Sequence, residues 1–148
     1  TRVLTTIHEY GHYLDHHLVP EKVGILGSFA THGISTTLSV GGKVNGLMTT
    51  IKSSKTIEKL RTYLHDINSR SWTLYALTDK ELFARAYSQY IAKKSGNKQL
   101  LQELAIRQPK EPVDSWKLIY DQWDDVDFEP IMGRFDDLFR ELGWLKEK

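Results

Sequence analysis

Residues 6–17, TIHEYGHYLDHH, contain four of the six histidines of the chain. Two of them, His8 and His12, bracket Glu9 in the pattern HExxH. On a helix, positions four apart lie on one face, so both imidazoles can approach a single metal ion. Glu9 lies about 100° further around the helix axis, where it can take a proton from a water as a general base. The spacing therefore predicts two zinc ligands and a catalytic carboxylate.

A catalytic zinc site needs a third protein ligand and one open position. His16 is a poor third ligand because eight residues of helix from His8 span roughly 12 Å. Neither glycine nor proline lies between His12 and His16 to break the helix. The three-histidine pattern of the metzincins is also excluded, because position 18, where it needs a histidine, is Leu18. A carboxylate from a second helix is the better candidate.

Glu81 is the strongest candidate for this carboxylate. It opens the segment ELFARAYSQY, in which Ala84 is small enough for the helix to approach the first helix closely. Gly11 costs the first helix roughly 1 kcal/mol relative to alanine, which indicates a close neighbour on that side. Glu58 and Glu103 also lie on predicted helices but lack this setting of small and aromatic residues.

Two blocks of the sequence, HEYGHYLD and YALTDKELFARAYSQYIAKKSG, resemble the metallopeptidase-like domain of phage minor head (head-morphogenesis) proteins and of large polyvalent proteins of mobile elements. These families pair an HEYGH helix with a later E-x-x-A-R-A helix in a gluzincin-like scheme. The resemblance covers residues 3–96 and leaves the C-terminal helices unassigned. It implies that His8, His12 and Glu81 bind zinc and that Glu9 is the catalytic carboxylate.

The resemblance implies a zincin-like, zinc-dependent metallopeptidase of phage or mobile-element origin, with a protein or peptide as substrate. Its partners would be phage capsid or portal proteins, in the cytoplasm of the bacterial host or in the virion. One alternative is a catalytically silent structural or interaction domain of a phage head protein, stabilised by its metal. Another is a toxin-like hydrolase that acts on a host protein.

Two charged residues near these blocks have open interpretations. Asp15 lies on the same side of the first helix as the two histidines, where it would hold one of them, face solvent or cap the helix near its end. Arg85 would form a helix ion pair with Glu81, orient that carboxylate or bind a carboxylate of the substrate.

The remaining histidines and aromatic residues are predicted to be structural. Tyr87 and Tyr90 would stabilise an oxyanion or, as is commoner at helical spacing, belong to the core. His16 and His17 are predicted to be surface residues. No chemistry is assigned to His32 and His65. The four tryptophans are predicted to be buried where helices pack together: Trp72, Trp116, Trp123 and Trp144.

The elements that must position these residues are predicted to be mainly helical. A helical period covers residues 2–18, and the glycine-rich segment 21–55 follows. Within it, TTLSVGGKVNGLMTTI (residues 36–51) predicts a β-hairpin or flap at one wall of the cleft. The remaining predicted helices cover residues 55–68, 80–96 with Gly96 as its end, 97–106, 112–125 and 129–145. The predicted fold class is thus α+β, mainly helical.

Length and composition suit one compact domain, residues 1–148, in which residues 1–96 carry the site and 97–148 add helices. The chain begins with Thr1 just before the motif, so we expect a domain excised from a larger protein. A net charge of +1 predicts no nucleic-acid partner, and no apolar run is long enough to predict a membrane span. The absence of cysteine excludes thiolate ligands, which leaves histidine, carboxylate and water for a metal.

Overall fold

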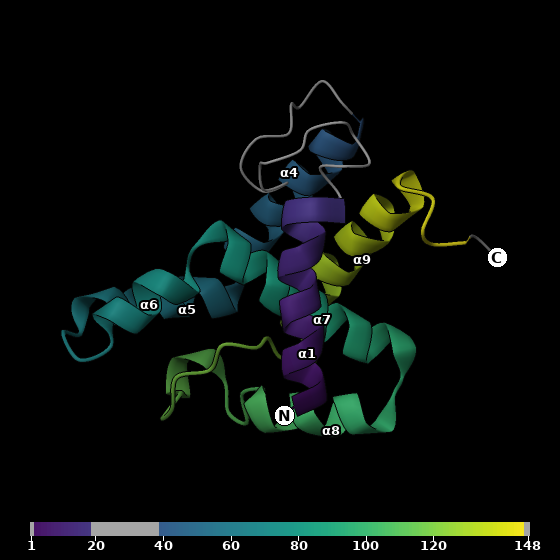
Figure 1. Ribbon diagram of the computed structural model, residues 1–148. Coiled ribbons are helices and arrows are strands. Elements are labelled where there is room, and N and C mark those ends of the chain that lie inside the picture. The colour runs from purple at the N-terminus through teal and green to yellow at the C-terminus, as the bar shows by residue number, and fades with distance from the viewer. Residues whose placement is uncertain (1, 19–38, 147–148) are drawn as a thin grey trace.

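The computed structural model describes residues 2–18 and 39–146, whose regular structure is entirely helical (Figure 1). None of the described helices is both long and apolar enough to cross a bilayer. The α-helices are α1 (Arg2–Tyr13), α4 (Ser39–Lys52), α5 (Lys55–Thr62), α6 (Arg70–Ala76), α7 (Asp79–Ser95), α8 (Lys98–Arg107) and α9 (Asp125–Glu141). A π-helical turn, η1 (Leu14–Leu18), and two 3-10 turns, η2 (Tyr63–His65) and η3 (Val113–Ser115), complete the set.

The predicted α+β fold class and its β-hairpin are wrong for the part of the chain that the structure describes. Residues 39–52 form α4 instead of two strands. Val44, Leu47, Met48 and Ile51 follow a helical period, and all four are buried. Packing of this stripe against α9 therefore outweighs the β propensity and the two adjacent glycines that favoured a hairpin. The rest of the predicted flap, up to residue 38, lies outside the described residues.

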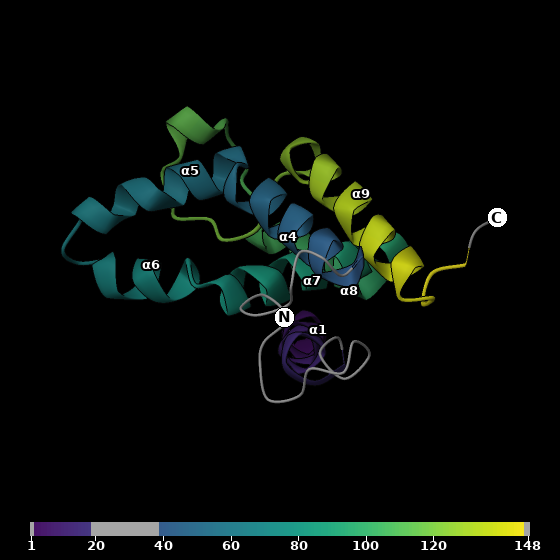
Figure 2. The same cartoon turned by 90° about the horizontal axis from the view of Figure 1, so that it is seen from above.

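Helix α7 runs through the centre of the molecule, and every residue from 81 to 90 is buried. Helix α1 crosses one side of α7, while α4 and α9 pack against each other on the opposite side (Figures 1 and 2). Gly96 ends α7 in the left-handed conformation, at φ 64°, as the sequence predicted.

The core between α7 and α9 is built from aromatic rings. Phe135, fully buried, stacks on Tyr90 at a centroid distance of 4.9 Å and contacts Phe83 at 5.8 Å. Burial of one such side chain is worth roughly 1.5–3 kcal/mol. This cluster covers the side of α7 that faces α9, and α1 packs against the opposite side.

Two predicted helices differ from the observed ones after residue 108. Of the predicted helix 112–125, residues 112–124 form only η3 and an irregular stretch, in which side chains rather than helical turns satisfy the backbone of Trp123. The Gln89 amide accepts from the Trp123 N–H at 3.0 Å and donates to its carbonyl at 2.8 Å. The last helix, α9, begins at Asp125, ahead of the predicted start, where Asp124 accepts a capping hydrogen bond from the backbone of Asp127.

Helix α6 was not predicted at all. The predicted helix over residues 55–68 ends instead at Thr62, followed by the turn η2, and Ile67 is 80 % exposed. Together α5 and α6 form an arm that extends from one end of α7 (Figure 2).

Candidate metal centre

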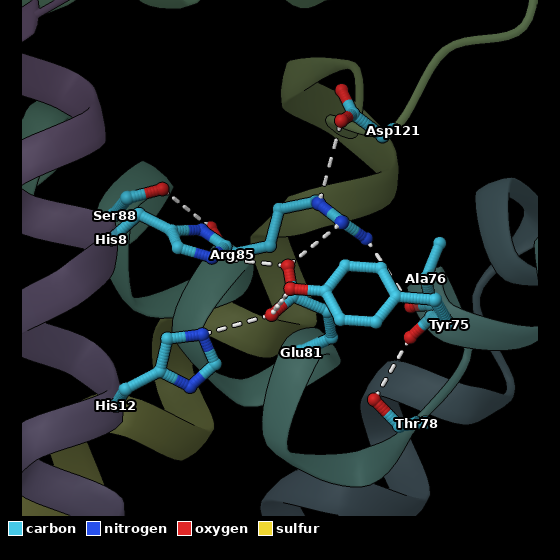
Figure 3. A network of polar contacts seen from close by, with 9 residues as sticks. All are labelled: His8, His12, Tyr75, Ala76, Thr78, Glu81, Arg85, Ser88 and Asp121. Atoms are coloured by element: carbon cyan, nitrogen blue, oxygen red, sulfur yellow. Dashed lines mark hydrogen bonds and ion pairs between the residues drawn. The ribbon is translucent and has the colours of Figure 1, made fainter. Parts of the chain in front are cut away.

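The carboxylate of Glu81, on α7, meets both histidines of the HExxH motif on α1 (Figure 3). His8 Nε2 lies 3.1 Å from Glu81 Oε1, and His12 Nε2 lies 2.8 Å from Glu81 Oε2. Both imidazoles therefore turn the same nitrogen toward one carboxylate that is distant in sequence.

The meeting depends on a close approach of the two helix backbones. A Cβ atom placed on Gly11 would lie 2.9 Å from the Cα of Ala84 and 3.2 Å from its carbonyl oxygen. Only glycine at position 11 fits this crossing without movement, and a small residue at position 84 keeps α7 close. The prediction that Gly11 and Ala84 mark a helix–helix contact is confirmed.

Each oxygen of Glu81 also has a second partner. The hydroxyl of Tyr75, from α6, donates to Oε2 at 2.9 Å, and the guanidinium of Arg85 donates to Oε1 at 3.2 Å. The Glu81 side chain is only 4 % exposed, so these four contacts replace the water that it loses on folding. Glu81 is thus held in one orientation from three helices.

Arg85 orients Glu81 and is buried, with a side-chain exposure of 5 %. Besides Glu81, it donates to the carbonyl oxygen of Ala76 at 3.3 Å, and its Nε lies 3.5 Å from Asp121 Oδ2. Of the three interpretations of Arg85, the ion pair and the orienting role describe the structure. Binding of a substrate carboxylate does not, because the guanidinium is buried and already engaged.

The contacts shift the ionisation of the central pair. Burial raises the pKa of Glu81, but the hydrogen bonds from His12, His8 and Tyr75 outweigh burial and hold the pKa well below its usual value. The hydrogen bond to Glu81 raises the pKa of His12 against the opposing effect of burial, with smaller contributions from Glu9 and Asp15. The site therefore presents a carboxylate that stays ionised.

Glu9 lies on the exposed side of α1, beside the histidines. Glu9, His8 and His12 each have a ligand atom within 4.8 Å of the others, so Glu9 is itself close enough to bind a metal. Glu81 differs from Glu9 in being buried, in contacting both imidazoles and in being held by two further donors. Glu9 is exposed and has the freedom that a proton-transferring group needs.

The residues present fit a zinc ion. Two imidazoles and one carboxylate are an established donor set for catalytic zinc. Ligand atoms that share one tetrahedral zinc lie roughly 3.4 Å apart, and the two histidine–Glu81 separations of 3.1 and 2.8 Å are slightly shorter.

The chain matches no protein-family model, no curated protein and no solved structure. The site must therefore be interpreted from its own geometry.

Asp15 is fully buried, which excludes the solvent-facing interpretation. His16 packs edge-on against the ring of His17, at a centroid distance of 4.5 Å, in the π-helical turn that follows α1. Tyr87 and Tyr90 are buried among the rings of α9, and the Tyr90 hydroxyl donates to Asp136 at 2.7 Å. The core interpretation of both tyrosines is confirmed.

The two other acidic residues considered as metal ligands, Glu103 and Glu58, do not lie at this site, and only two of the four tryptophans are buried. Glu103 accepts a hydrogen bond from the backbone of Leu4 at 3.1 Å, which fixes the start of α1, and Glu58 is exposed on α5. Trp123 and Trp116 are buried as predicted, whereas Trp72 and Trp144 are each 41 % exposed.

Sequence reasoning missed Tyr75 and Asp121. Tyr75 lies in the unpredicted helix α6. The sequence feature that could have indicated it is its place at the start of the block that carries the resemblance, six residues before Glu81. Asp121 lies in an irregular segment and gave no local signal.

Proposed function

We propose that this chain is a zinc-dependent, metallopeptidase-like hydrolase. The observation that carries the proposal is the contact of Glu81 with the Nε2 atoms of both His8 and His12. An HExxH pattern by itself is short enough to occur by chance. Here the buried carboxylate of Glu81 contacts both histidines of the pattern, although it lies on a helix about 70 residues further along the chain. This convergence supports a metal site rather than a chance occurrence of the pattern.

In this proposal His8, His12 and Glu81 hold the ion, and Glu9 does the proton transfer. Zinc supplies a lowered pKa for a bound water and polarises the carbonyl of the scissile bond. Glu9 accepts a proton from the attacking water and then delivers it to the leaving amine. Tyr75 and Arg85 keep the Glu81 carboxylate in place during these steps.

The exposure of the site supports access for water and substrate. The side chains of His8 and His12 are 16 % and 25 % exposed, whereas Glu81 beneath them is 4 % exposed. Solvent thus reaches the site from the side of α1 on which Glu9 lies. A protein or peptide substrate, and a phage head protein as the parent, rest on the sequence resemblance alone.

The first experiment is elemental analysis of zinc per chain in protein purified without a histidine tag, followed by an assay with a mixture of fluorogenic peptides. We expect close to one zinc per chain and hydrolysis that a chelator stops. E81A serves as the control and should lose the zinc. Absence of zinc after incubation with excess metal would refute the proposal. Bound zinc without any turnover would favour the silent structural domain.

A further inference from the structure

The irregular segment before α9 reaches the candidate metal centre through Asp121 and Arg85. We infer that these two are positioning residues, which set the affinity of the site for zinc by holding Glu81. The inference rests on the proposed function only in taking zinc as the ion. It gives the C-terminal part of the chain, which the sequence resemblance leaves unassigned, a direct role at the site.

Arg85 joins three parts of the molecule through three separate atoms (Figure 3). Its Nη2 donates to Glu81 Oε1 at 3.2 Å on α7, its Nη1 donates to the carbonyl of Ala76 at 3.3 Å at the end of α6, and its Nε pairs with Asp121 Oδ2 at 3.5 Å. A planar guanidinium whose three nitrogens all have partners has little freedom to rotate. The position of Glu81 therefore depends on whether Asp121 holds the Nε of Arg85.

The charges of Arg85 and Asp121 also affect how strongly Glu81 would bind a cation. A buried guanidinium 3.2 Å from a ligand carboxylate repels a divalent cation that binds that carboxylate. Asp121 places a negative charge 3.5 Å from the Nε of Arg85 and offsets this repulsion. Loss of the Asp121 charge would thus loosen Glu81 and also strengthen the repulsion, and both effects weaken zinc binding.

Asp121 is itself held in place by its neighbour Trp123. The Trp123 backbone exchanges two hydrogen bonds with Gln89, one helical turn beyond Arg85 on α7, and its indole donates to Ser54 Oγ at 2.9 Å. Helix α7 thus contacts this segment through two residues one turn apart, Arg85 and Gln89. This anchoring fixes the carboxylate of Asp121 opposite Arg85, although the segment forms no regular structure.

The test is the dissociation constant for zinc, measured by competition with a chromogenic chelator, in D121N and in matched controls. Removal of a group that orients a metal ligand typically weakens binding by about 10–100-fold, and we expect D121N to fall in that range. D114N, which removes the same charge from an exposed position in the turn η3 ahead of this segment, should bind as the wild type does. D121E keeps the charge and should restore most of the affinity.

R85K is the second variant and keeps the inference falsifiable if D121N fails to fold. A lysine cannot reach Glu81, Ala76 and Asp121 together, so it should weaken zinc binding by about tenfold or more. Wild-type affinity in either folded variant, or an equal loss in D114N, would overturn the inference and leave the proposed function intact. A wild-type chain that binds no zinc would overturn both. The metal-free melting temperature of D121N should stay near that of D114N, which separates positioning from general destabilisation.

Discussion

At the residue scale, the Glu81 carboxylate is the point where four side chains from three helices converge. His8 and His12 approach from α1, Tyr75 from α6, and Arg85 from one turn further along α7. Such a buried carboxylate would be costly without partners. With four donors it is an ionised group in a fixed orientation beneath two partly exposed histidines, and these are properties that a metal ligand needs.

Replacement of Glu9 by glutamine separates the ligand role from the base role. We expect E9Q to retain one zinc per chain and to lose hydrolysis by about 10²–10⁴-fold, because a neutral amide cannot accept the proton. Zinc content and peptide turnover are measured on the same sample. Loss of zinc in E9Q would show that Glu9 is a ligand, and retained turnover in the metal-replete variant would refute its assigned role.

The Glu81–His12 contact should make the stability of the metal-free chain depend on pH. The lowered pKa of Glu81 contributes stability above its usual value of 4.5 and loses it as the pH falls. The raised pKa of His12 contributes stability that is complete below its usual value of 6.5 and is lost as the pH rises through the folded value. We therefore expect this pair to contribute most between about pH 4.5 and 6.5.

Urea denaturation of the chelator-treated protein at pH 5.5 and pH 8.5 tests this expectation. Wild type should lose stability at the higher pH, and E81Q, which removes the carboxylate that raises the pKa of His12, should lose clearly less. An equal loss in both proteins would place the pH dependence elsewhere. Saturating zinc should reverse the trend, because the metal binds the neutral imidazole.

At the scale of the elements, the site depends on the spacing of α1 and α7. Gly11 lets the two backbones approach until a Cβ would meet the Cα of Ala84 at 2.9 Å. Helix propensity alone would favour alanine at position 11 by about 1 kcal/mol. The chain accepts this cost because a wider crossing would carry both histidines away from Glu81.

G11A should accordingly destabilise the protein in spite of its better helix propensity. Overpacking at a tight contact costs about 1–3 kcal/mol, so the net loss should be on the order of 1 kcal/mol after the propensity gain. G133A is the matched control, since Gly133 also lies inside a helix, α9, and a Cβ there meets nothing within 4 Å. It should raise stability by up to about 1 kcal/mol.

Urea denaturation of both glycine variants without metal gives the comparison. Zinc affinity should fall in G11A and stay unchanged in G133A. A G11A protein as stable as G133A would mean that the helices separate without cost, contrary to the close contact between Gly11 and Ala84.

At the scale of the whole molecule, residues from both sides of position 96 build one core. Phe83 and Tyr90 of α7 contact Phe135 of α9, and Asp127 at the start of α9 accepts hydrogen bonds from the backbone N–H and the hydroxyl of Thr56 on α5. Helix α7, which carries Glu81, is thus supported by the C-terminal helix α9. Any ion bound between α1 and α7 would stabilise this entire assembly.

Zinc should therefore raise the melting temperature of the chain. At a free concentration of a hundred times the dissociation constant, binding adds about 2.7 kcal/mol, which corresponds to about 5–10 °C for a domain of this size. Differential scanning calorimetry with and without zinc measures the shift. H8A, which lacks one ligand, should show almost none, and a full shift in H8A would indicate that the metal binds elsewhere.

The sequence by itself determined the parts of the site that follow from local helical geometry. The four-residue spacing of His8 and His12 places both on one face of α1, and the small residues Gly11 and Ala84 marked the helix crossing. The helical periods of α7 and α8 were equally readable. In each case the deciding interactions lie within one or two turns of helix, so the residue pattern carries the information.

Tertiary structure decided the rest. Packing against α9 made a helix of residues 39–52, although local propensity favoured strands. The hydrogen bonds from Gln89 kept the stretch around Trp123 out of a helix and so placed Asp121 against Arg85. The pairs Gln89–Trp123 and Arg85–Asp121 join residues more than 30 positions apart, and neither pair leaves a period in the sequence. The buried stripe of α4 does follow a helical period, but its meaning became clear only from the packing against α9.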